Sequence, residues 1–357
     1  MKISPWNIIS SQLAQTPQVP REDLSGQTVI VVGIARETKC ETAEMWLLDL
    51  GSFDSVNAFV DRAESELPRV DLLIENAGVL PTETLDGTQD GWETAFQVNN
   101  LSTSLLALLL LPRMIKTAQE FNTKPRIVVV SSEVHYFAKL QDKLHTHVLL
   151  VLNVLFVRSL AERIKDKPVI VDTVNPGYCL SNLRKGLRGF RAAMDWMMEK
   201  LIARTSEEGA RQVVWAAIGG KDKEDKLRGG YISQMDVQEP SDFVLSTVGK
   251  TFQEKIWVGM ISELCAVNPK LEPIVKEFPS KPVGETGAVK EPEVTRTRKT
   301  STTSPALDEA MKARSTVAPD KVEPQSEDRK VDVVDKPEET PAAVETVESK
   351  VAQEGQE

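Results

Sequence analysis

The sequence predicts an α/β fold with a parallel, doubly wound sheet. Short apolar, β-branched runs that end in Gly, Asn, Asp or Ser recur along the first half of the chain, and segments of helical length separate them. Runs of this kind are typical of strands buried on both faces. Regular alternation of strand and helix favours a parallel sheet, in which ligands bind beyond the carboxyl ends of the strands.

The elements follow from these patterns in chain order. The expected strands are Gln27–Gly33, Ala43–Leu50, Val70–Gly78, Pro125–Ser132 and Pro168–Gly177, and the expected helices among them are Ser55–Glu66, Gly91–Thr117 and Val148–Lys165. Residues 191–220 then predict two further helices with an apolar face of Met, Trp, Leu, Ile and Val. Core packing explains this face as well as a lid over an apolar substrate does.

Composition narrows the class of protein. The chain has 357 residues and a net charge of −10 without a basic patch, so nucleic acid is not an expected partner. Its three cysteines are widely spaced and form no C-x-x-C pair, which is typical of reduced thiols in a cytoplasmic protein. The longest apolar runs, Leu105–Pro112 and Val148–Val157, are shorter than the roughly 20 residues that span a bilayer. We therefore expect a soluble protein without a membrane span.

The chain changes character near Phe278. No Phe, Trp or Tyr follows that residue, and Lys281–Glu357 carries 12 basic and 17 acidic side chains. Such a segment buries too little apolar surface to offset the entropy cost of ordering it. The predicted organisation is an N-terminal arm over residues 1–23, one α/β domain over 24–278 and a disordered tail over 279–357.

Polar motifs close the expected strands. They are "DL" (Asp49–Leu50), "ENAG" (Glu75–Gly78), "VNNLS" (Val98–Ser102), "VVVSS" (Val128–Ser132) and "NPGYCLS" (Asn175–Ser181). In this order and spacing the region from about Leu24 to Lys270 resembles the short-chain dehydrogenase/reductase family, in the retinol-dehydrogenase-like branch abundant in filamentous fungi. The resemblance implies a Rossmann-type fold, NAD or NADP as cofactor, and exchange of a secondary alcohol with a ketone. It also implies a lipophilic substrate from secondary metabolism, such as a terpenoid or polyketide.

The same resemblance assigns roles to single residues. The implied catalytic residues are Ser132, which matches the catalytic serine, and Asn99, which matches an asparagine that kinks a helix and binds water. In an active enzyme both would polarise the substrate's carbonyl group. The implied cofactor contacts are Gly33 at the end of the first strand, Asp49 at the adenine, Asn76 and Gly78 at the adenosine side, and Gly177, Cys179 and Ser181 in the loop over the nicotinamide. Residues of about 180–270 correspond to the family's substrate lobe.

One departure lies after the first strand. The family places a T-G-x-x-x-G-I-G turn there, whose glycines let the backbone reach the pyrophosphate. Here only Ile34–Thr42 separates Gly33 from the next expected strand, whereas a parallel crossover needs a dozen residues or more. The fold is thus truncated by roughly one βαβ unit, about 30 residues. The element that distinguishes NAD from NADP is missing with it.

A second departure affects acid/base chemistry. The family's Tyr-x-x-x-Lys pair supplies the proton that the reaction exchanges, and it aligns here with Thr146 and Leu150, which cannot perform that role. Tyr136 follows Ser132 too closely to replace the tyrosine. The three histidines (His135, His145 and His147) favour a solvated loop over a proton relay, and no metal site is expected.

Three interpretations remain open. In the first, the chain is an active member of the family. In the second, it is a catalytically inactive module that binds a ligand or forms a homodimer through a helix pair of Val148–Arg163. In the third, the chain is the product of an altered gene model, with one segment skipped after Gly33 and another misread around Leu144–Val151.

Overall fold

The computed structural model describes residues 5–19, 21–33, 43–81, 86–138, 146–184 and 189–278. All of them belong to one compact unit, Met1–Ala318. The predicted disordered tail, the short connection Ile34–Thr42 and His145 lie outside the described residues. The boundaries expected at residues 23 and 278 stay predictions.

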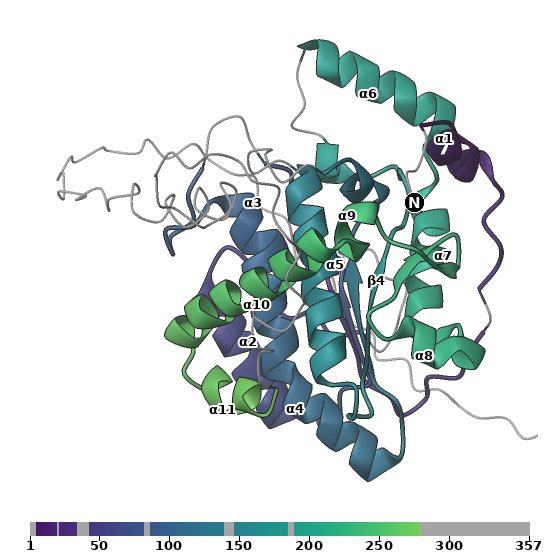
Figure 1. Cartoon of the computed structure of the whole chain (residues 1–357). Coiled ribbons are helices and arrows are strands. Elements are labelled where there is room, and N and C mark those ends of the chain that lie inside the picture. Colours follow the sequence, from purple (N-terminus) through teal and green to yellow (C-terminus); the bar gives the residue numbers. More distant parts are fainter. Residues whose placement is uncertain are drawn as a thin grey trace, which may run out of the picture. The chain divides into compact units, whose positions relative to one another are not determined.

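A six-stranded sheet forms the centre of the described fold. Its strands are β1 (Val29–Val32), β2 (Leu72–Glu75), β3 (Arg126–Val130), β4 (Ile170–Val174), β5 (Tyr231–Ser233) and β6 (Asp236–Gln238), adjacent in that order. The first five are parallel and β6 is antiparallel to β5. The carboxyl ends of the five parallel strands therefore lie on the same side of the sheet (Figure 1).

Helices cover both faces of this sheet. They are α1 (Pro5–Leu13), α2 (Phe53–Glu66), α3 (Thr94–Phe96), α4 (Thr103–Phe121), α5 (Thr146–Arg163), α6 (Gly189–Ile202), α7 (Ser206–Ile218), α8 (Glu224–Leu227), α9 (Asp242–Leu245), α10 (Thr247–Val267) and α11 (Leu271–Lys276). Short helical turns are η1 (Gln97–Ser102), η2 (Glu133–Phe137), η3 (Asn182–Arg184) and η4 (Lys221–Lys223). One core joins the sheet to α2, α4, α5 and α10, and a second joins its other face to α7. The predicted α/β, Rossmann-type class is confirmed.

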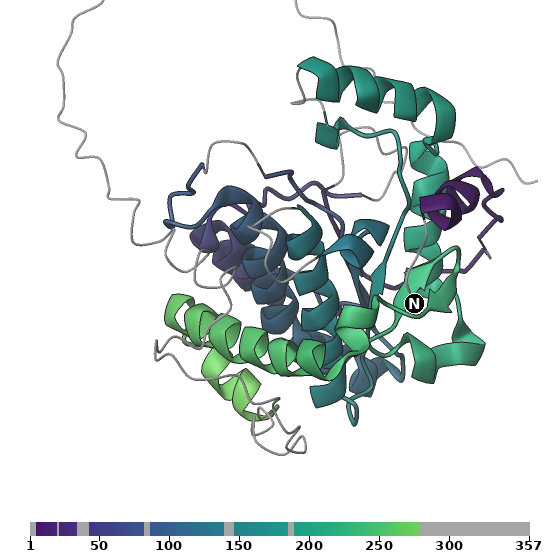
Figure 2. The ribbon, with the colours of Figure 1, turned by 45° about the horizontal axis from the view of Figure 1, so that its top comes forward.

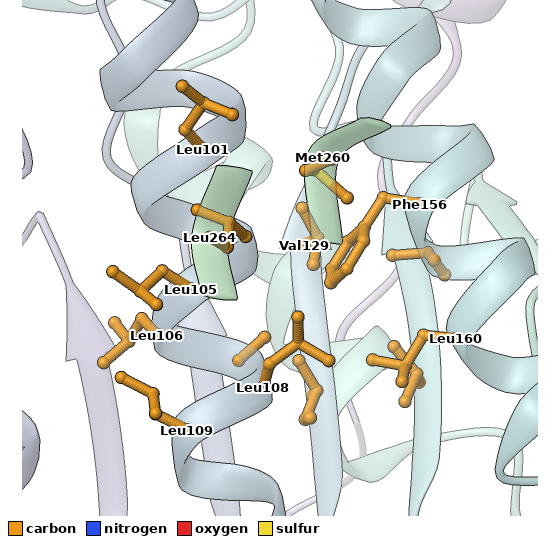
Figure 3. Close-up of a cluster of buried hydrophobic side chains, with 14 of the residues drawn as sticks. Leu101, Leu105, Leu106, Leu108, Leu109, Val129, Phe156, Leu160, Met260 and Leu264 are labelled. Atoms are coloured by element: carbon orange, nitrogen blue, oxygen red, sulfur yellow. The ribbon is translucent and has the colours of Figure 1, made fainter. Parts of the chain in front are cut away.

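The leucine-rich helix α4 fills the larger core (Figure 3). Leu105 and Leu108 are fully buried and pack with Val129 of β3, Phe156 of α5 and Leu264 of α10. The continuous helical stretch Thr94–Phe121 is long and apolar enough to cross a membrane, but 89% of its most apolar part is buried inside the fold. It is a core helix.

The predicted strand Ala43–Leu50 is wrong, because this described segment pairs with no strand. A parallel neighbour of β1 needs a crossover of at least a dozen residues, and the nine positions of Ile34–Thr42 are too few. As a result β1 is an edge strand of the described sheet. This half-sheet is what a doubly wound sheet retains when the strands beyond its first strand are absent.

The helix Val148–Arg163, which the sequence suggested as the contact of a homodimer, is covered within the chain itself. Helix α10 of the same chain covers α5, with Phe156 and Trp257 stacked at 6.1 Å between ring centroids. Arg163 forms an ion pair with Glu254 of α10 at 2.6 Å. From Val151 to Leu160 the apolar side chains of α5 are buried against the chain's own elements, so this stretch offers no exposed apolar face to a second copy.

Candidate active site

The carboxyl ends of β1 and β2 lie in close contact at the candidate site. Gly33 follows β1 with a φ of +93°, a conformation that favours glycine. A Cβ atom added to Gly33 would lie 2.9 Å from Ala77 in the turn after β2, so only glycine allows this approach. The structure thus places Gly33 against the turn that contains Asn76 and Gly78, whose residues are exposed.

Asn99 holds this turn from the other side. It lies in η1, a π-helical turn that leads into α4, so the helix is distorted where the sequence predicted a kink. Its amide donates to the Val79 carbonyl at 2.8 Å and accepts from the Val79 N–H at 2.9 Å. A Cβ on Gly78 would lie 3.2 Å from the Asn99 Oδ1 atom. The structure therefore brings Asn99 and Gly78 together.

Ser132 lies just beyond β3 and caps η2. Its hydroxyl accepts a weak hydrogen bond from the Val134 N–H at 3.4 Å, and the side chain is half-buried. Beside it, the buried Glu133 carboxylate accepts from the Asn175 amide at 2.8 Å. The same asparagine accepts from the Gly177 N–H at 3.0 Å, which connects the ends of β3 and β4. Burial raises the pKa of Glu133, and its hydrogen bond from Asn175 opposes that rise.

The expectation that the histidines lie in a solvated loop is wrong for His135. Only 1% of this residue is exposed, and its ring packs on Tyr136 and Tyr231 at centroid distances of 4.1 and 4.6 Å. Nε2 accepts from the Ser241 N–H at 3.2 Å, so Nδ1 carries the proton and donates to the Ser132 carbonyl at 2.7 Å. Burial lowers the pKa of His135 to about 4. His135 is a neutral structural residue rather than a proton relay.

Tyr136 does not replace the missing tyrosine either. Its hydroxyl donates to the Glu239 carbonyl, far along the chain from Ser132. Burial raises the pKa of Tyr136, and neighbouring carboxylates add to the rise. A phenol that is held in this way does not exchange a proton near neutral pH.

Helix α1 packs on the loop after β4, a contact that the sequence did not reveal. The Gln12 side chain donates to the Tyr178 carbonyl and accepts from the Tyr178 N–H, each at 3.0 Å. Arg204 donates to the Ser11 carbonyl at 2.7 Å. A Cβ on Gly177, whose φ is +87°, would lie 2.5 Å from Gln12 Oε1 and 2.8 Å from Arg204. Glycine at this position lets the loop, α1 and Arg204 meet.

Cys179 and Ser181, the other predicted cofactor contacts of this loop, lie in different environments. The Cys179 thiol faces α7, where it donates to the Pro176 carbonyl at 3.4 Å and lies beside Gly209. Burial raises the pKa of the Cys179 thiol, which favours the unreactive protonated form. Ser181 is exposed, and its hydroxyl accepts from the Leu183 N–H at 3.4 Å. The structure therefore does not bring these two side chains together.

Helix α5 contacts the end of β3 and the turn η1 through hydrogen bonds to its backbone. Ser131, next to Ser132, donates to the Leu150 carbonyl at 3.1 Å, and Asn100, next to Asn99, donates to the Leu149 carbonyl at 2.8 Å. Leu150 is half-buried on this helix, and Thr146 lies one turn before it. The two positions that align with the family's Tyr-x-x-x-Lys pair hold neither a tyrosine nor a lysine.

At the adenosine side, Asp49 and Glu75 differ in environment. Asp49 is exposed, and its Oδ1 atom accepts from the Gly51 N–H at 2.8 Å within a turn. Glu75 ends β2 and is buried, and neither of its carboxyl oxygens has a hydrogen-bond partner among the described residues. Burial raises the pKa of Glu75 well above its usual range, which favours the neutral carboxyl group.

The Glu75→Gln variant is expected to flatten the pH dependence of stability. Because the pKa of Glu75 is raised on folding, the native state binds the proton more tightly, and stability falls as pH rises from the unfolded pKa toward the folded one. Denaturant unfolding between about pH 5 and pH 8 measures this slope. The exposed Glu64→Gln variant should keep the wild-type slope, and an unchanged slope in Glu75→Gln would contradict the assignment.

Comparison with known proteins identifies the family. The family model described as enoyl-(acyl carrier protein) reductase matches residues 25–217. The short chain dehydrogenase/reductase dmxR8 of Cryptosporiopsis sp. is 36% identical over 258 residues, covering 65% of this chain and 77% of that protein. The short-chain dehydrogenase/reductase ffsI of Aspergillus flavipes is 29% identical over 265 residues, covering 68% and 76%. The chain belongs to the short-chain dehydrogenase/reductase family of oxidoreductases.

Solved structures are more distant. The NADPH-bound carbonyl reductase from chicken fatty liver is 17% identical to this chain and superimposes with a TM-score of 0.42. The matched region covers 54% of this chain and 71% of the reductase. A similarity at this level assigns no ligand to the present site.

The residues that would hold the two ends of a nicotinamide dinucleotide are Asn76 and Gly78 after β2 and the Gly177 loop after β4. Both glycines pack closely on the chain's own side chains, Gly78 on Asn99 and Gly177 on Gln12 and Arg204. After Gly33, in contrast, the next glycine in the sequence is Gly51. The glycine-rich turn that brings backbone N–H groups to a pyrophosphate is absent from the sequence.

Proposed function

We propose that the chain binds NAD or NADP and interconverts a secondary alcohol and a ketone on a lipophilic small molecule. A terpenoid or polyketide of a cytoplasmic secondary-metabolite pathway is the substrate class that the family resemblance suggests. The observation that carries the proposal is the pair of hydrogen bonds between Asn99 and Val79. These bonds fix Gly78 and the end of β2, which is the neighbour of the strand that Ser132 follows.

Each part of the site has a role in this proposal. Asn76 and Gly78 would hold the adenosine side of the cofactor, and the Gly177 loop, with Cys179 and Ser181, would lie over the nicotinamide. When bound, the cofactor supplies or accepts the hydride. The Ser132 hydroxyl would donate to the substrate's carbonyl oxygen, with Asn99 as the positioning residue.

The proton that balances the hydride is the weak point of the reaction. In the family a tyrosine supplies it, and a lysine lowers that tyrosine's pKa. Thr146 and Leu150 provide neither function, so we expect hydride transfer to be slow and limited by proton transfer from water.

Cofactor oxidation in the presence of lipophilic ketones tests the proposal. We expect a slow but measurable rate with NADPH or NADH, which falls by about 10²-fold in Ser132→Ala because one carbonyl donor is lost. The exposed Ser65→Ala variant in α2 is the matched control and should keep the wild-type rate. A rate that is equal in Ser132→Ala and wild type would exclude Ser132 from the chemistry.

A second candidate function is a binding module without catalysis. The sequence of α5 favours it, since that helix contacts Ser131 but holds threonine at the tyrosine position and leucine at the lysine position. This candidate predicts a folded chain that binds a dinucleotide or a lipophilic ligand and transfers no hydride to any ketone. Sequencing the transcript tests the remaining possibility of an altered gene model, which a cDNA identical to the present sequence would exclude.

A further inference from the structure

Helix α6 exposes its apolar side chains. Met194 (46% exposed), Trp196 (64%), Met197 (48%) and Leu201 (65%) lie on its outward face, which we call the α6 outward face. A surface helix normally buries its apolar stripe and exposes its charges. Of the two explanations that the sequence left open for these residues, core packing therefore does not apply to this face.

The charged side chains of α6 fix this orientation. Asp195 and Glu199 are directed toward the protein, where Arg184 forms ion pairs with them at 2.9 and 3.0 Å. The Tyr178 hydroxyl also donates to Asp195 at 2.5 Å. These partly buried contacts hold the acidic side of the helix inward and leave the apolar side outward.

A second copy of the chain is a poor occupant for this face. A helix of 14 residues is about 21 Å long and roughly 10 Å wide, so one side offers on the order of 200 Å². A stable protein interface buries about 800 Å² from each partner. The α6 outward face alone is too small for a stable dimer.

The local charge favours a different occupant. Between Arg184 and Lys200 the sequence has five basic and two acidic side chains, although the whole chain has a net charge of −10. Both acidic side chains are paired with Arg184. A basic segment with exposed Trp, Met and Leu side chains is typical of helices that lie in the headgroup region of anionic membranes. Helix α1, whose Trp6 is 73% exposed, lies beside α6 in both views (Figures 1 and 2).

We propose that the α6 outward face docks the protein onto an anionic lipid surface. Trp196 and Met197 enter the interface between headgroups and acyl chains, and Lys200 remains at the headgroups. The docking is peripheral and uses no residue of the proposed reaction. Vesicle binding can therefore be measured without cofactor or substrate. It would place the loop after β4 next to the phase in which lipophilic molecules dissolve.

Vesicle flotation of the full chain tests this docking. We expect the protein to float with phosphatidylcholine vesicles that contain phosphatidylserine, to bind vesicles of phosphatidylcholine alone more weakly, and to dissociate at high salt. Met197→Glu should lower the bound fraction by about tenfold, because a methionine side chain that enters the lipid is lost and a negative charge is added. Val258→Glu in α10 is the matched control, since Val258 is 46% exposed on a helix outside the face.

The contradicting results are distinct. A wild-type chain that remains in the aqueous fraction with both vesicle types would overturn the proposal. Equal loss of binding in Met197→Glu and Val258→Glu would also overturn it, because the effect would not be specific to α6. Sedimentation equilibrium without lipid detects the alternative occupant, since a dimer that Met197→Glu dissociates would assign the face to a second copy instead.

Discussion

Thr146→Tyr combined with Leu150→Lys is expected to raise the rate of ketone reduction by about 10²- to 10⁴-fold, the usual contribution of a positioned general acid. The two positions are one helical turn apart on α5, so a tyrosine and a lysine introduced there would share a face of the helix. The carbonyl of Leu150 already accepts from Ser131, which fixes the helix next to the serine that would polarise the substrate. The variant therefore adds chemistry to an existing scaffold.

Steady-state reduction of a lipophilic ketone measures this gain. The matched control is Thr146→Phe with Leu150→Lys, which has the same ring size and charge without the hydroxyl. We expect no gain from it. If the tyrosine variant folds and binds cofactor like the wild type but reduces the ketone no faster, the placement of α5 relative to Ser132 is wrong.

Arg204→Ala is expected to lower the free energy of unfolding by about 2 to 4 kcal/mol, because hydrogen bonds to a buried charge contribute about 1.5 to 3 kcal/mol each. Arg204 is buried and donates to the Ser11 carbonyl at 2.7 Å and to the Gln234 side chain at 2.9 Å. Its positive charge also lowers the pKa of the buried Glu133. Removal of the guanidinium takes away the contact with α1 and the positive charge that lowers the pKa of Glu133.

Urea unfolding gives the change in stability, and limited proteolysis near Leu13 reports the release of α1. Arg204→Lys should recover only part of the loss, since lysine keeps the charge but not the two-pronged geometry. Arg62→Ala, which removes an exposed arginine from α2, should change stability little. A small effect of Arg204→Ala, comparable to that of Arg62→Ala, would show that α1 does not depend on this contact.

Much of the fold could be predicted because its central strands and core helices are almost fully buried. The β-branched run of β3 and the leucines of α4 are apolar without a solvated face, and such sequences identify central elements before any contact is known. The motif around Asn99 predicted a kinked helix, and a π-helical turn lies there, whereas the role of Asn99 in the site stays a prediction.

The rest depends on contacts between distant residues. His135 has a polar local sequence, but Tyr231 and Ser241, about 100 positions away, bury its ring. Gln12 binds Tyr178, which is 166 positions later, and no local pattern indicates that pair. The strand expected at Ala43–Leu50 had the right composition, but the chain before it is too short to return it to the sheet.

Isothermal titration of the folded protein with NADPH and with NADH tests the central claim most directly, with circular dichroism as the check of folding. The claim is that Asn99, Gly78 and the Gly177 loop still form a dinucleotide site without the glycine-rich turn. We expect saturable binding of at least one nucleotide with a dissociation constant in the micromolar range, weakened in Asn99→Ala. A folded protein that binds neither nucleotide would contradict the claim.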